Sequence, residues 1–499
     1  MRWTAWIGHL SAGAVASLAL PPLSLVPFLL ALSWPALCFA RASSHRQVVG
    51  IWMAAAAGWF IASTHWTAHS LLVGQAEFWF LVPLAAVGLP LVLALFWAAA
   101  AALAWQVGST PIGRVLWLVP SLALAEYGRG FVATGFPWNA PGYVFSAADA
   151  ILQSASLIGL YGLTLVAFGF AVAVSLWRLD ARRISLFLVL VPVALTGFGV
   201  TRLHLVDPIE AQSGAVARLV QPHIPQAEKW DFDRRAIHLQ QMIALSTASP
   251  NKADIVIWPE TAFAGLLDAN PALLRAISSE TVTPDAHLIT GLLRFDGTEH
   301  YYNAAAMLNH WGQVQATYDK RHLVPFGEYA PLRDYIPFVD VIAGPKDYSS
   351  GGPQAYFNSP ALGQLQLSIC YESIFPGQII PPDNPTATRP DVIINITNDG
   401  WFGTSLGPYQ HEAQARMRAV EEGIPLLRVA NTGISAGYDA YGRVLGRLGL
   451  GAVGAIDISV PPHTMRTPYV TYREFPFMLM VIAAMILAWS LDGRRALRQ

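Results

Sequence analysis

Apolar stretches of membrane-spanning length dominate the first 205 residues of the chain. They lie at 5–20, 23–40, 48–66, 80–106, 113–128, 150–176 and 184–203, and an eighth closes the chain at 475–491. A helix needs about 20 apolar residues to cross a bilayer, and short polar or Pro/Gly-containing segments separate these stretches. The pattern predicts eight transmembrane helices: seven in a membrane domain at 1–205 and one in a C-terminal segment at 471–499.

The pattern changes between residues 206 and 470, where short strand-like segments alternate with polar turns and amphipathic helices. Helical spacing marks "RRAIHLQQMIALSTA" and "QHEAQARMRAVEEG". Strands interleaved with helices predict an α/β domain with the layers of an α-β-β-α sandwich. The strand candidates are "ARLVQ", "DIVIWP", "AHLITGLLR", "NAAAMLN", "VQATYD", "QLQLSIC", "DVIINIT", "LLRVAN" and "SAGYDA".

Composition places part of the chain in lipid. Its 499 residues are 54% hydrophobic and 13% charged, with a mean hydropathy of +0.41, whereas soluble globular domains carry about 25% charged residues. The formal net charge of −1 leaves no electrostatic footprint for nucleic acid, and we expect no such partner.

Arginine in the short loops sets the expected orientation. Arg41, Arg114 and Arg182 follow the second, fourth and sixth apolar stretches, and further arginines follow the eighth. These loops fall on one side of the bilayer, and the positive-inside rule assigns that side, with both termini, to the cytoplasm. Residues 206–470 then face outward, and this segment is large enough to bury a soluble core.

Three strand-like runs in this segment end in an ionisable residue at a turn. They are "DIVIWPE" ending at Glu260, "QATYDK" ending at Lys320 and "LQLSIC" ending at Cys370. Strand ends on a rigid sheet can hold such groups within mutual reach beside a pocket. A carboxylate can take the proton of a thiol, while an ammonium group favours the thiolate and stabilises the oxyanion that follows attack on a carbonyl. The combination indicates acyl transfer through a thioester.

Each of the three residues also has a plainer interpretation. Cys370 alone would be a small buried hydrophobic residue, Glu260 a turn carboxylate and Lys320 a solvated strand end. A disulfide between Cys370 and the other cysteine, Cys38, would have to join an apolar segment to a distant domain. The catalytic interpretation is favoured because the three residues occur together and with the motifs that flank them.

These motifs carry a family resemblance. "WPE", "YDKRHLVPFGEYAPLR" and "ICYE", in this order and followed by "NITNDGWFG", resemble the nitrilase superfamily. The apolar stretches around them make the whole chain similar to the membrane-embedded apolipoprotein N-acyltransferase family. The resemblance implies that Glu260 is the general base, that Lys320 stabilises the tetrahedral intermediate and that Cys370 is the acylated nucleophile.

The resemblance also implies further site residues. Glu328, Tyr371 and Glu372 match supporting positions of the family, with the Tyr371 N–H as an oxyanion donor. Trp230 matches a tryptophan near the lipid-binding site. Trp401 and Phe402 follow a strand end and are candidates for lining the acyl pocket, although such aromatic residues more often belong to a core.

The implied reaction is ping-pong transfer of an acyl chain. Cys370 takes the chain from a phospholipid such as phosphatidylethanolamine and passes it to the α-amine of the N-terminal diacylglyceryl-cysteine of an apolipoprotein. We expect a monomer without cofactor or metal in the bacterial inner membrane, with its catalytic domain in the periplasm. The segment 344–353 is a candidate lid or an ordinary exposed loop, and His411 with Glu412 is interpreted as a helix-surface pair.

Two other functions remain open at this stage. A membrane-anchored amidase or nitrile hydrolase would use the same three residues with water as acceptor, but eight apolar stretches exceed what anchoring needs. A transporter would carry paired charges or broken helices along a path through its spans, and these stretches contain few charges.

Overall fold

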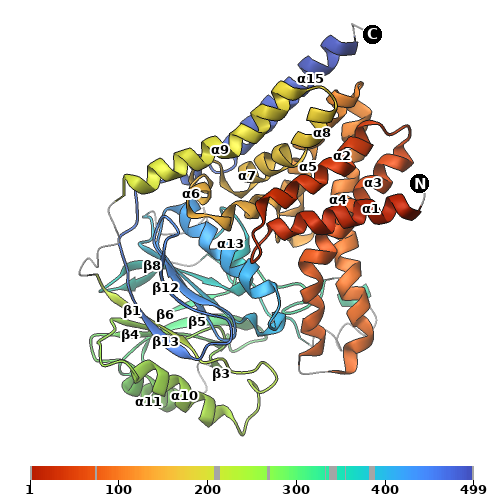
Figure 1. Ribbon diagram of the computed structural model, residues 1–499. Helices are drawn as coiled ribbons and strands as arrows, with labels where there is room; N and C mark the ends of the chain where they lie inside the picture. Colours follow the sequence, from red (N-terminus) through yellow and green to blue (C-terminus); the bar gives the residue numbers. More distant parts are fainter. Residues whose placement is uncertain are drawn as a thin grey trace. The chain divides into compact units, whose positions relative to one another are not determined.

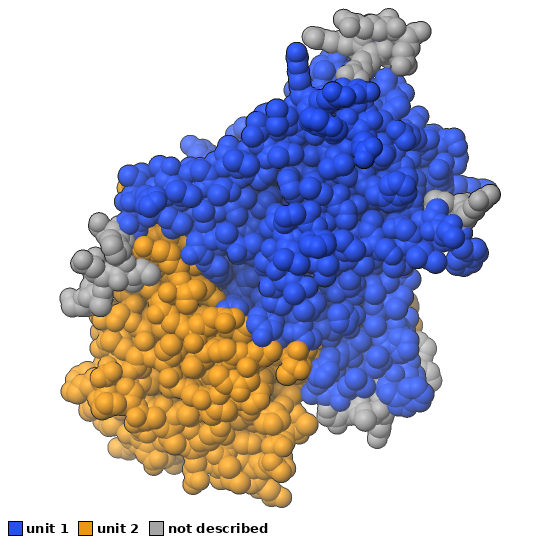
Figure 2. Space-filling view, in the orientation of Figure 1, with its two compact units in different colours: residues 1–206, 405–422, 466–499 blue, residues 207–404, 423–465 orange. Residues whose placement is uncertain are grey.

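The computed structural model describes residues 3–73, 76–206, 214–266, 270–331, 333–335, 346–353, 356–380 and 388–496. The chain divides into two compact units, coloured separately in Figure 2. Unit 1 contains Met1–Val206, Ser405–Glu422 and Arg466–Gln499, and unit 2 contains Asp207–Thr404 and Gly423–Met465.

Unit 1 is helical, and its helices follow the apolar stretches of the sequence. They are α1 (Trp3–Ala16), α2 (Ser33–Ala40), α3 (His45–Thr64), α4 (Val82–Val107), α5 (Pro111–Arg129), α6 (Asp149–Leu152), α7 (Ala155–Ala171), α8 (Ala173–Arg178), α9 (Arg182–His204), α13 (Gly407–Glu422), α14 (Pro468–Tyr472) and α15 (Phe475–Ala496).

Five helical stretches of the described residues are long and apolar enough to cross a membrane: His45–Leu72, Trp79–Val107, Ala155–Arg178, Arg182–His204 and Phe475–Gly493. The predicted number was eight. Three predicted stretches are missing for physical reasons. Helix α1 spans 14 residues, the apolar helix Val26–Ala40 is also too short, and α5 carries Arg114 and Glu126 within its otherwise apolar sequence. Several apolar helices compatible with a membrane domain are therefore present. Not all eight predicted stretches are both long enough and apolar enough to cross a membrane.

The interior of unit 1 combines aromatic packing with buried ion pairs, one of which joins Glu126 and Arg129. The ring of Trp97 on α4 lies 5.2 Å from that of Phe168 on α7, centroid to centroid. Its indole Nε1 donates to Glu126 Oε1 at 2.6 Å, and Glu126 also pairs with Arg129 one turn further along α5. Both charged side chains are buried. The two opposite charges neutralise each other, so the pair is compatible with an apolar environment.

Helix α13 lies inside the 206–470 segment of the sequence but packs within unit 1. The amide oxygen of Gln410 accepts hydrogen bonds from the indole N–H groups of Trp66 and Trp138, at 3.1 and 3.0 Å. His411 is fully buried, with its ring 5.1 Å from that of Trp138. The interpretation of His411 as part of a surface pair is therefore wrong, because indole and amide partners give polar residues of this helix a buried environment.

Unit 2 contains two β-sheets. The first has the strand order β13-β1-β2-β4-β5-β6, with β3 paired to β4, and the second has the order β12-β11-β10-β9-β8-β7. The strands of the first sheet are β1 (Val216–Gln221), β2 (Ile255–Ile257), β3 (Phe263–Leu266), β4 (His287–Phe295), β5 (Tyr301–Asn309), β6 (Val314–Asp319) and β13 (Gly454–Ser459). Those of the second are β7 (Phe357–Ser359), β8 (Gly363–Ile369), β9 (Val392–Thr397), β10 (Leu426–Ala430), β11 (Ser435–Tyr438) and β12 (Val444–Leu448).

Two apolar cores explain this layering. Leu219 and Ile257 of the first sheet pack with Ile369 and Ile396 of the second in a core between the sheets. On the other face of the first sheet, residues such as Leu288 pack against α10 (Arg235–Thr247) and α11 (Pro271–Thr281), which lie together in Figure 1. Strands buried on both faces read as near-continuous apolar runs rather than alternating ones, which is how these strands appear in the sequence.

All nine predicted strands are present in unit 2, together with the predicted helix α10. The sequence pattern missed β3, β7, β12, β13 and α11. Strands β3, β7 and β12 lie off the centre of their sheets, where half-exposed residues carry a weaker apolar signal.

Candidate active site

Glu260, Lys320 and Cys370 all follow strands that end at the same edge of the two sheets. Strands β1, β2 and β4 are mutually parallel, as are β8, β9 and β10. Lys320 comes directly after β6 and Cys370 directly after β8, while Glu260 follows β2. Carboxyl ends of parallel strands are where α/β folds gather functional groups. All three residues are buried, with exposed fractions of 7%, 1% and 7% for Glu260, Lys320 and Cys370.

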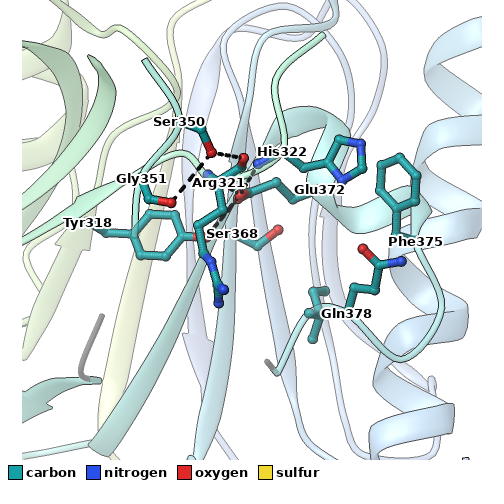
Figure 3. Close-up of a pocket in the computed structure, with 10 residues that line it drawn as sticks. Tyr318, Arg321, His322, Ser350, Gly351, Ser368, Glu372, Phe375 and Gln378 are labelled. Carbon is teal, nitrogen blue, oxygen red and sulfur yellow. Dashed lines mark hydrogen bonds between the residues drawn. The ribbon is translucent and has the colours of Figure 1, made fainter. Parts of the chain in front are cut away.

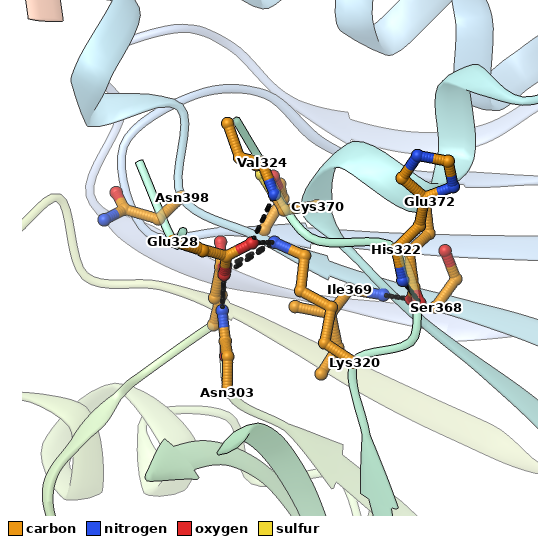
Figure 4. A network of polar contacts seen from close by, with 12 residues as sticks. Asn303, Lys320, His322, Val324, Glu328, Ser368, Ile369, Cys370, Glu372 and Asn398 are labelled. Carbon is orange, nitrogen blue, oxygen red and sulfur yellow. Dashed lines mark hydrogen bonds and ion pairs between the residues drawn. The ribbon is translucent and has the colours of Figure 1, made fainter. Parts of the chain in front are cut away.

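Lys320 lies between two carboxylates. Its Nζ is 2.8 Å from Glu328 Oε2, a contact drawn in Figure 4, and 3.6 Å from Glu260 Oε1. Burial lowers the pKa of the Lys320 ammonium, but the charges of Glu328 and Glu260 outweigh it and leave that pKa well above its usual value. Lys320 therefore stays charged throughout the physiological range, as its predicted role of stabilising an oxyanion requires.

Asn303 joins the same two carboxylates and was not predicted from the sequence. Its Nδ2 donates to Glu260 Oε1 and to Glu328 Oε1, each at 2.7 Å. Asn303 lies on β5, next to β6 in the sheet. It is one residue of the strand-like run "NAAAMLN", where nothing in the pattern distinguishes it from a strand-end polar residue.

The thiol of Cys370 is protonated at rest. Burial and the nearby charge of Glu260 raise its pKa to about 12, against the opposing charge of Lys320. The side chain of Thr397 hydrogen-bonds to the sulfur and lowers that pKa in part. The sequence predicts that the ammonium favours the thiolate, and the charge of Lys320 does lower the pKa of Cys370. Burial raises that pKa by more. The predicted role of Cys370 as a nucleophile therefore requires a base that removes its proton.

The backbone of Cys370 is strained. Its φ is +50°, in the left-handed region that costs an L-residue about 1–2 kcal/mol. It opens a short 3₁₀ helix, Cys370–Ile374, immediately after β8. Strain of this kind persists where the surrounding structure holds it in place, commonly at active sites.

Glu372 supplies part of that surrounding structure. Its carboxylate accepts hydrogen bonds from the N–H groups of Ile369 and Arg321, at 2.6 and 2.7 Å, and from the hydroxyl of Tyr318 at 3.0 Å. Burial raises the pKa of Glu372, while the two N–H donors lower it. One carboxylate thus ties the turn that carries Cys370 to the residue that follows Lys320.

A cavity of about 420 Å³ lies beside Glu372 (Figure 3). Its lining includes Tyr318, Arg321, Ser368 and Glu372, but not the three predicted catalytic residues. Tyr371 is buried, and its ring lies 5.1 Å from that of Phe375, which also lines the cavity. The cavity therefore lies beside the turn that carries Cys370, but Cys370 is not part of its lining.

The three predicted substrate-binding residues lie on two joined segments. Trp230 and Trp401 are 43% and 40% exposed, and Phe402 is partly buried. The segments are joined because Asn398 Nδ2 donates to Gln226 Oε1 at 2.5 Å. Exposed indole rings at the carboxyl ends of buried strands give this edge of unit 2 an apolar surface.

The side chains of the described residues do not offer a metal site, since no group of three or more His, Cys, Asp or Glu is arranged to hold an ion within that part of the chain.

Comparisons with known proteins cover the whole chain. A model of the carbon-nitrogen hydrolase family matches residues 216–467, and a model of the apolipoprotein N-acyltransferase N-terminal domain matches residues 12–173. An apolipoprotein N-acyltransferase of Rhodopseudomonas palustris is 36% identical, over 97% of this chain and 95% of the relative. Another, of Rhizobium leguminosarum bv. trifolii, is 39% identical, over 96% and 94%.

This chain belongs to the apolipoprotein N-acyltransferase family.

Solved structures were also compared with the chain. An amidase of Nesterenkonia sp. AN1 is 20% identical with a TM-score of 0.37, covering 55% of this chain and 98% of the amidase. A carbon-nitrogen hydrolase of Helicobacter pylori G27 is 14% identical with a TM-score of 0.37, covering 50% and 89%. The family assignment rests on the sequence matches alone.

The candidate lid of this acyltransferase family member lies partly outside the described residues. Within 346–353, the backbone N–H of Tyr348 donates to Glu328 O and that of Gly351 to Lys320 O, each at 2.8 Å. Asp347 pairs with Arg333. The described part of the segment is therefore hydrogen-bonded to the main chain of the two residues that form the central ion pair.

Gly291 on β4 is a second residue that the sequence did not reveal. A Cβ added there would lie 2.6 Å from Pro259 O and 2.7 Å from Glu260 Cα. The main chain of Glu260 can approach β4 this closely only because position 291 has no side chain.

We expect Gly291→Ala to displace Glu260 and to lower acyl-enzyme formation about 100-fold, since misplacing a catalytic group by about 1 Å costs this much. The rate of acyl-adduct formation, followed by mass spectrometry, measures the effect. Gly449→Ala is the matched control, because nothing lies within 4 Å of a Cβ added at Gly449 and its φ is not positive. An unchanged rate in Gly291→Ala would contradict the proposed dependence on the position of Glu260.

Proposed function

We propose that Glu260, Lys320 and Cys370 transfer an acyl chain from a phospholipid to the α-amine of the N-terminal diacylglyceryl-cysteine of an apolipoprotein. The observation that carries this function is the buried carboxylate–ammonium–thiol group, at the strand ends of a chain that is 36–39% identical throughout to apolipoprotein N-acyltransferases. The function is N-acylation through a cysteine thioester.

The first half-reaction loads Cys370. Glu260 removes the proton from Sγ as the sulfur attacks the ester carbonyl of the phospholipid, and a C–S bond forms. The oxyanion that results faces the Lys320 ammonium and the N–H of Tyr371. When the intermediate collapses, the ester C–O bond breaks and the proton on Glu260 passes to the leaving oxygen, which releases a lysophospholipid.

The second half-reaction unloads Cys370. The α-amine of the acceptor attacks the thioester carbonyl, and Glu260 takes a proton from the attacking nitrogen. The C–S bond breaks as the amide forms, and the departing sulfur regains the proton. The same acid–base residue thus serves both steps, and the enzyme returns to the protonated thiol that burial favours.

Supporting residues keep this geometry through both steps. Glu328 holds Lys320 at 2.8 Å, and Glu372 fixes the turn of Cys370 relative to the residue after Lys320. Trp230, Trp401 and Phe402 form an apolar edge that suits the acyl chains of both substrates. These side chains need not react, so their contribution is to binding and orientation.

Lipid substrates require a thiol at the depth of the lipid head groups. We propose that the eight apolar stretches cross the bacterial inner membrane with both termini in the cytoplasm, as the loop arginines favour. Unit 2 then faces the periplasm. Phosphatidylethanolamine fits as the donor because it presents an acyl ester at the depth of the lipid head groups.

Mass spectrometry of the purified chain incubated with phosphatidylethanolamine tests the function. We expect an adduct of one acyl chain on the peptide that contains Cys370, released by neutral hydroxylamine as a thioester is, and none on the peptide that contains Cys38. Cys370→Ser provides the baseline. On addition of a diacylated lipopeptide, the acyl group should pass to its amine.

Two results would contradict the proposal. An adduct mapped to Cys38 would remove Cys370 from its role. Release of free fatty acid at the same rate with and without the lipopeptide would make water the acceptor and the chain a hydrolase.

A further inference from the structure

Lys229 is a buried lysine at the edge of the active site. It lies in the segment that follows β1, beside Trp230, and its side chain is 4% exposed. Its Nζ donates a hydrogen bond to the main-chain oxygen of Glu260 at 2.8 Å. A buried ammonium that contacts the main chain of the general base is not required by the three-residue mechanism, so its presence needs a separate explanation.

The segment that carries Lys229 is fastened to the second sheet. The N–H of Ile224 donates to Asn431 Oδ1 at 3.1 Å, and Asn431 Nδ2 donates back to Ile224 O at 2.9 Å. Two residues further on, the side-chain oxygen of Gln226 accepts a hydrogen bond from Asn398, which follows β9. Lys229 therefore reaches Glu260 from a segment whose position is set by the strands around Cys370.

Charge balance gives Lys229 a function in this position. Glu260 and Glu328 carry two negative charges, and Lys320 carries one positive charge, within a group whose members are each at least nine-tenths buried. These three side chains together carry a net charge of −1, and an uncompensated buried charge is costly in free energy. The Lys229 ammonium supplies the missing positive charge while Cys370 is a neutral thiol.

The electrostatic contacts of Lys229 agree with this function. Burial lowers the pKa of Lys229 to about 8, against the charge of Glu260, which raises it. Lys229 is therefore mostly charged at pH 7. The same charges act in reverse, so a charged Lys229 favours the ionised form of both Glu260 and Cys370.

We propose that Lys229 is a second ammonium of the active site, a positioning residue that holds the main chain of Glu260 and keeps its carboxylate ionised to act as the base. The proposal rests on the assignment of Glu260 and Cys370 under the proposed function. It separates the roles of two lysines: Lys320 faces the reacting carbonyl, and Lys229 prepares the base.

The test compares the pH dependence of Cys370 reactivity in the wild-type chain and in Lys229→Met. Two reactions are followed in the full-length chain in detergent: acyl-adduct formation from phosphatidylethanolamine, and alkylation of Cys370 by iodoacetamide. In Lys229→Met, we expect the acidic limb of both profiles to move to higher pH by about one unit, because a nearby positive charge has been lost. At a given pH on that limb, a shift of this size lowers the rate about tenfold.

Two further variants complete the design. Lys229→Arg keeps the positive charge and should restore the position of the acidic limb. Lys252→Met removes an exposed lysine and should leave both profiles unchanged. Glu260→Gln identifies the acidic limb, which should be absent from its profile.

The outcomes are distinct. A wild-type acidic limb in Lys229→Met, or an equal loss of rate at every pH, overturns the electrostatic role. A shifted limb that Lys229→Arg restores supports it. Absence of the acyl adduct from the wild-type chain would count against the proposed function, but the alkylation profile would still decide the role of Lys229.

Discussion

Lys320→Met is expected to lower acyl-enzyme formation at least about 1,000-fold, since removal of a single oxyanion donor costs about 100- to 1,000-fold and Lys320 is the charged donor. The variant should also be less stable. Loss of Lys320 leaves Glu260 and Glu328 without the ammonium that lies 3.6 and 2.8 Å from them. Breaking a buried ion pair costs about 3–5 kcal/mol. Adduct formation by mass spectrometry and thermal unfolding in detergent measure the two effects.

Two variants separate chemistry from stability in this experiment. Lys320→Met combined with Glu328→Gln removes one of the orphaned charges, so it should recover part of the lost stability but none of the activity. Lys252→Met removes an exposed lysine, and it should change the unfolding free energy by less than about 0.5 kcal/mol. Recovery of activity in the double variant would show that Lys320 acts only through stability.

The elements that carry the chemistry could be predicted because they are locally encoded. Each of the strands that lead to Glu260, Lys320 and Cys370 is an apolar run closed by a turn, and such a run is visible in a single sequence. The meeting of the three residues followed from the parallel arrangement of strands, because strand ends then share one edge. The motifs around them added the roles that periodicity alone could not give.

The supporting residues could not be predicted because they act across the fold. Asn303 bonds to Glu260 from 43 positions away in sequence, and Gly291 is distinguished only by how closely Pro259 approaches it. A single sequence contains no signal for either contact. Lys229 was visible as one of few lysines in the chain, but its approach to Glu260 depends on how the segment after β1 is fastened to the other sheet.

Burial also changed the expected chemistry of the nucleophile. From the sequence, an ammonium beside a thiol indicates a stabilised thiolate. In the structure, Cys370 is 7% exposed, and the cost of burying its charge exceeds the attraction of Lys320. Burial also separates α13 from the rest of the 206–470 segment. Its sequence is polar, but the helix is buried and packs within unit 1.

Glu260→Gln is expected to lower acyl-enzyme formation about 100- to 10,000-fold at pH 7, the usual contribution of a general base. The pKa of the Cys370 thiol is raised to about 12 in the wild-type chain, so without a base the reaction depends on the small fraction of thiolate. Glu260 is one of the charges that raise this pKa, and the variant should therefore titrate lower. Below that pKa, each unit of pH still increases the thiolate fraction, and hence the residual rate, about tenfold.

The shape of the pH profile is therefore the decisive measurement. Between about pH 7 and 9 the wild-type rate should rise less steeply than that of Glu260→Gln, because the wild-type chain has a base for the thiol proton and the variant depends on the thiolate fraction. The glutamine keeps an oxygen for the hydrogen bond from Asn303, so the fold of the site should persist. Glu299→Gln alters an exposed glutamate and should behave as wild type. A level profile in Glu260→Gln would mean that another group removes the proton from Cys370, and the assignment of Glu260 as the base would then be wrong.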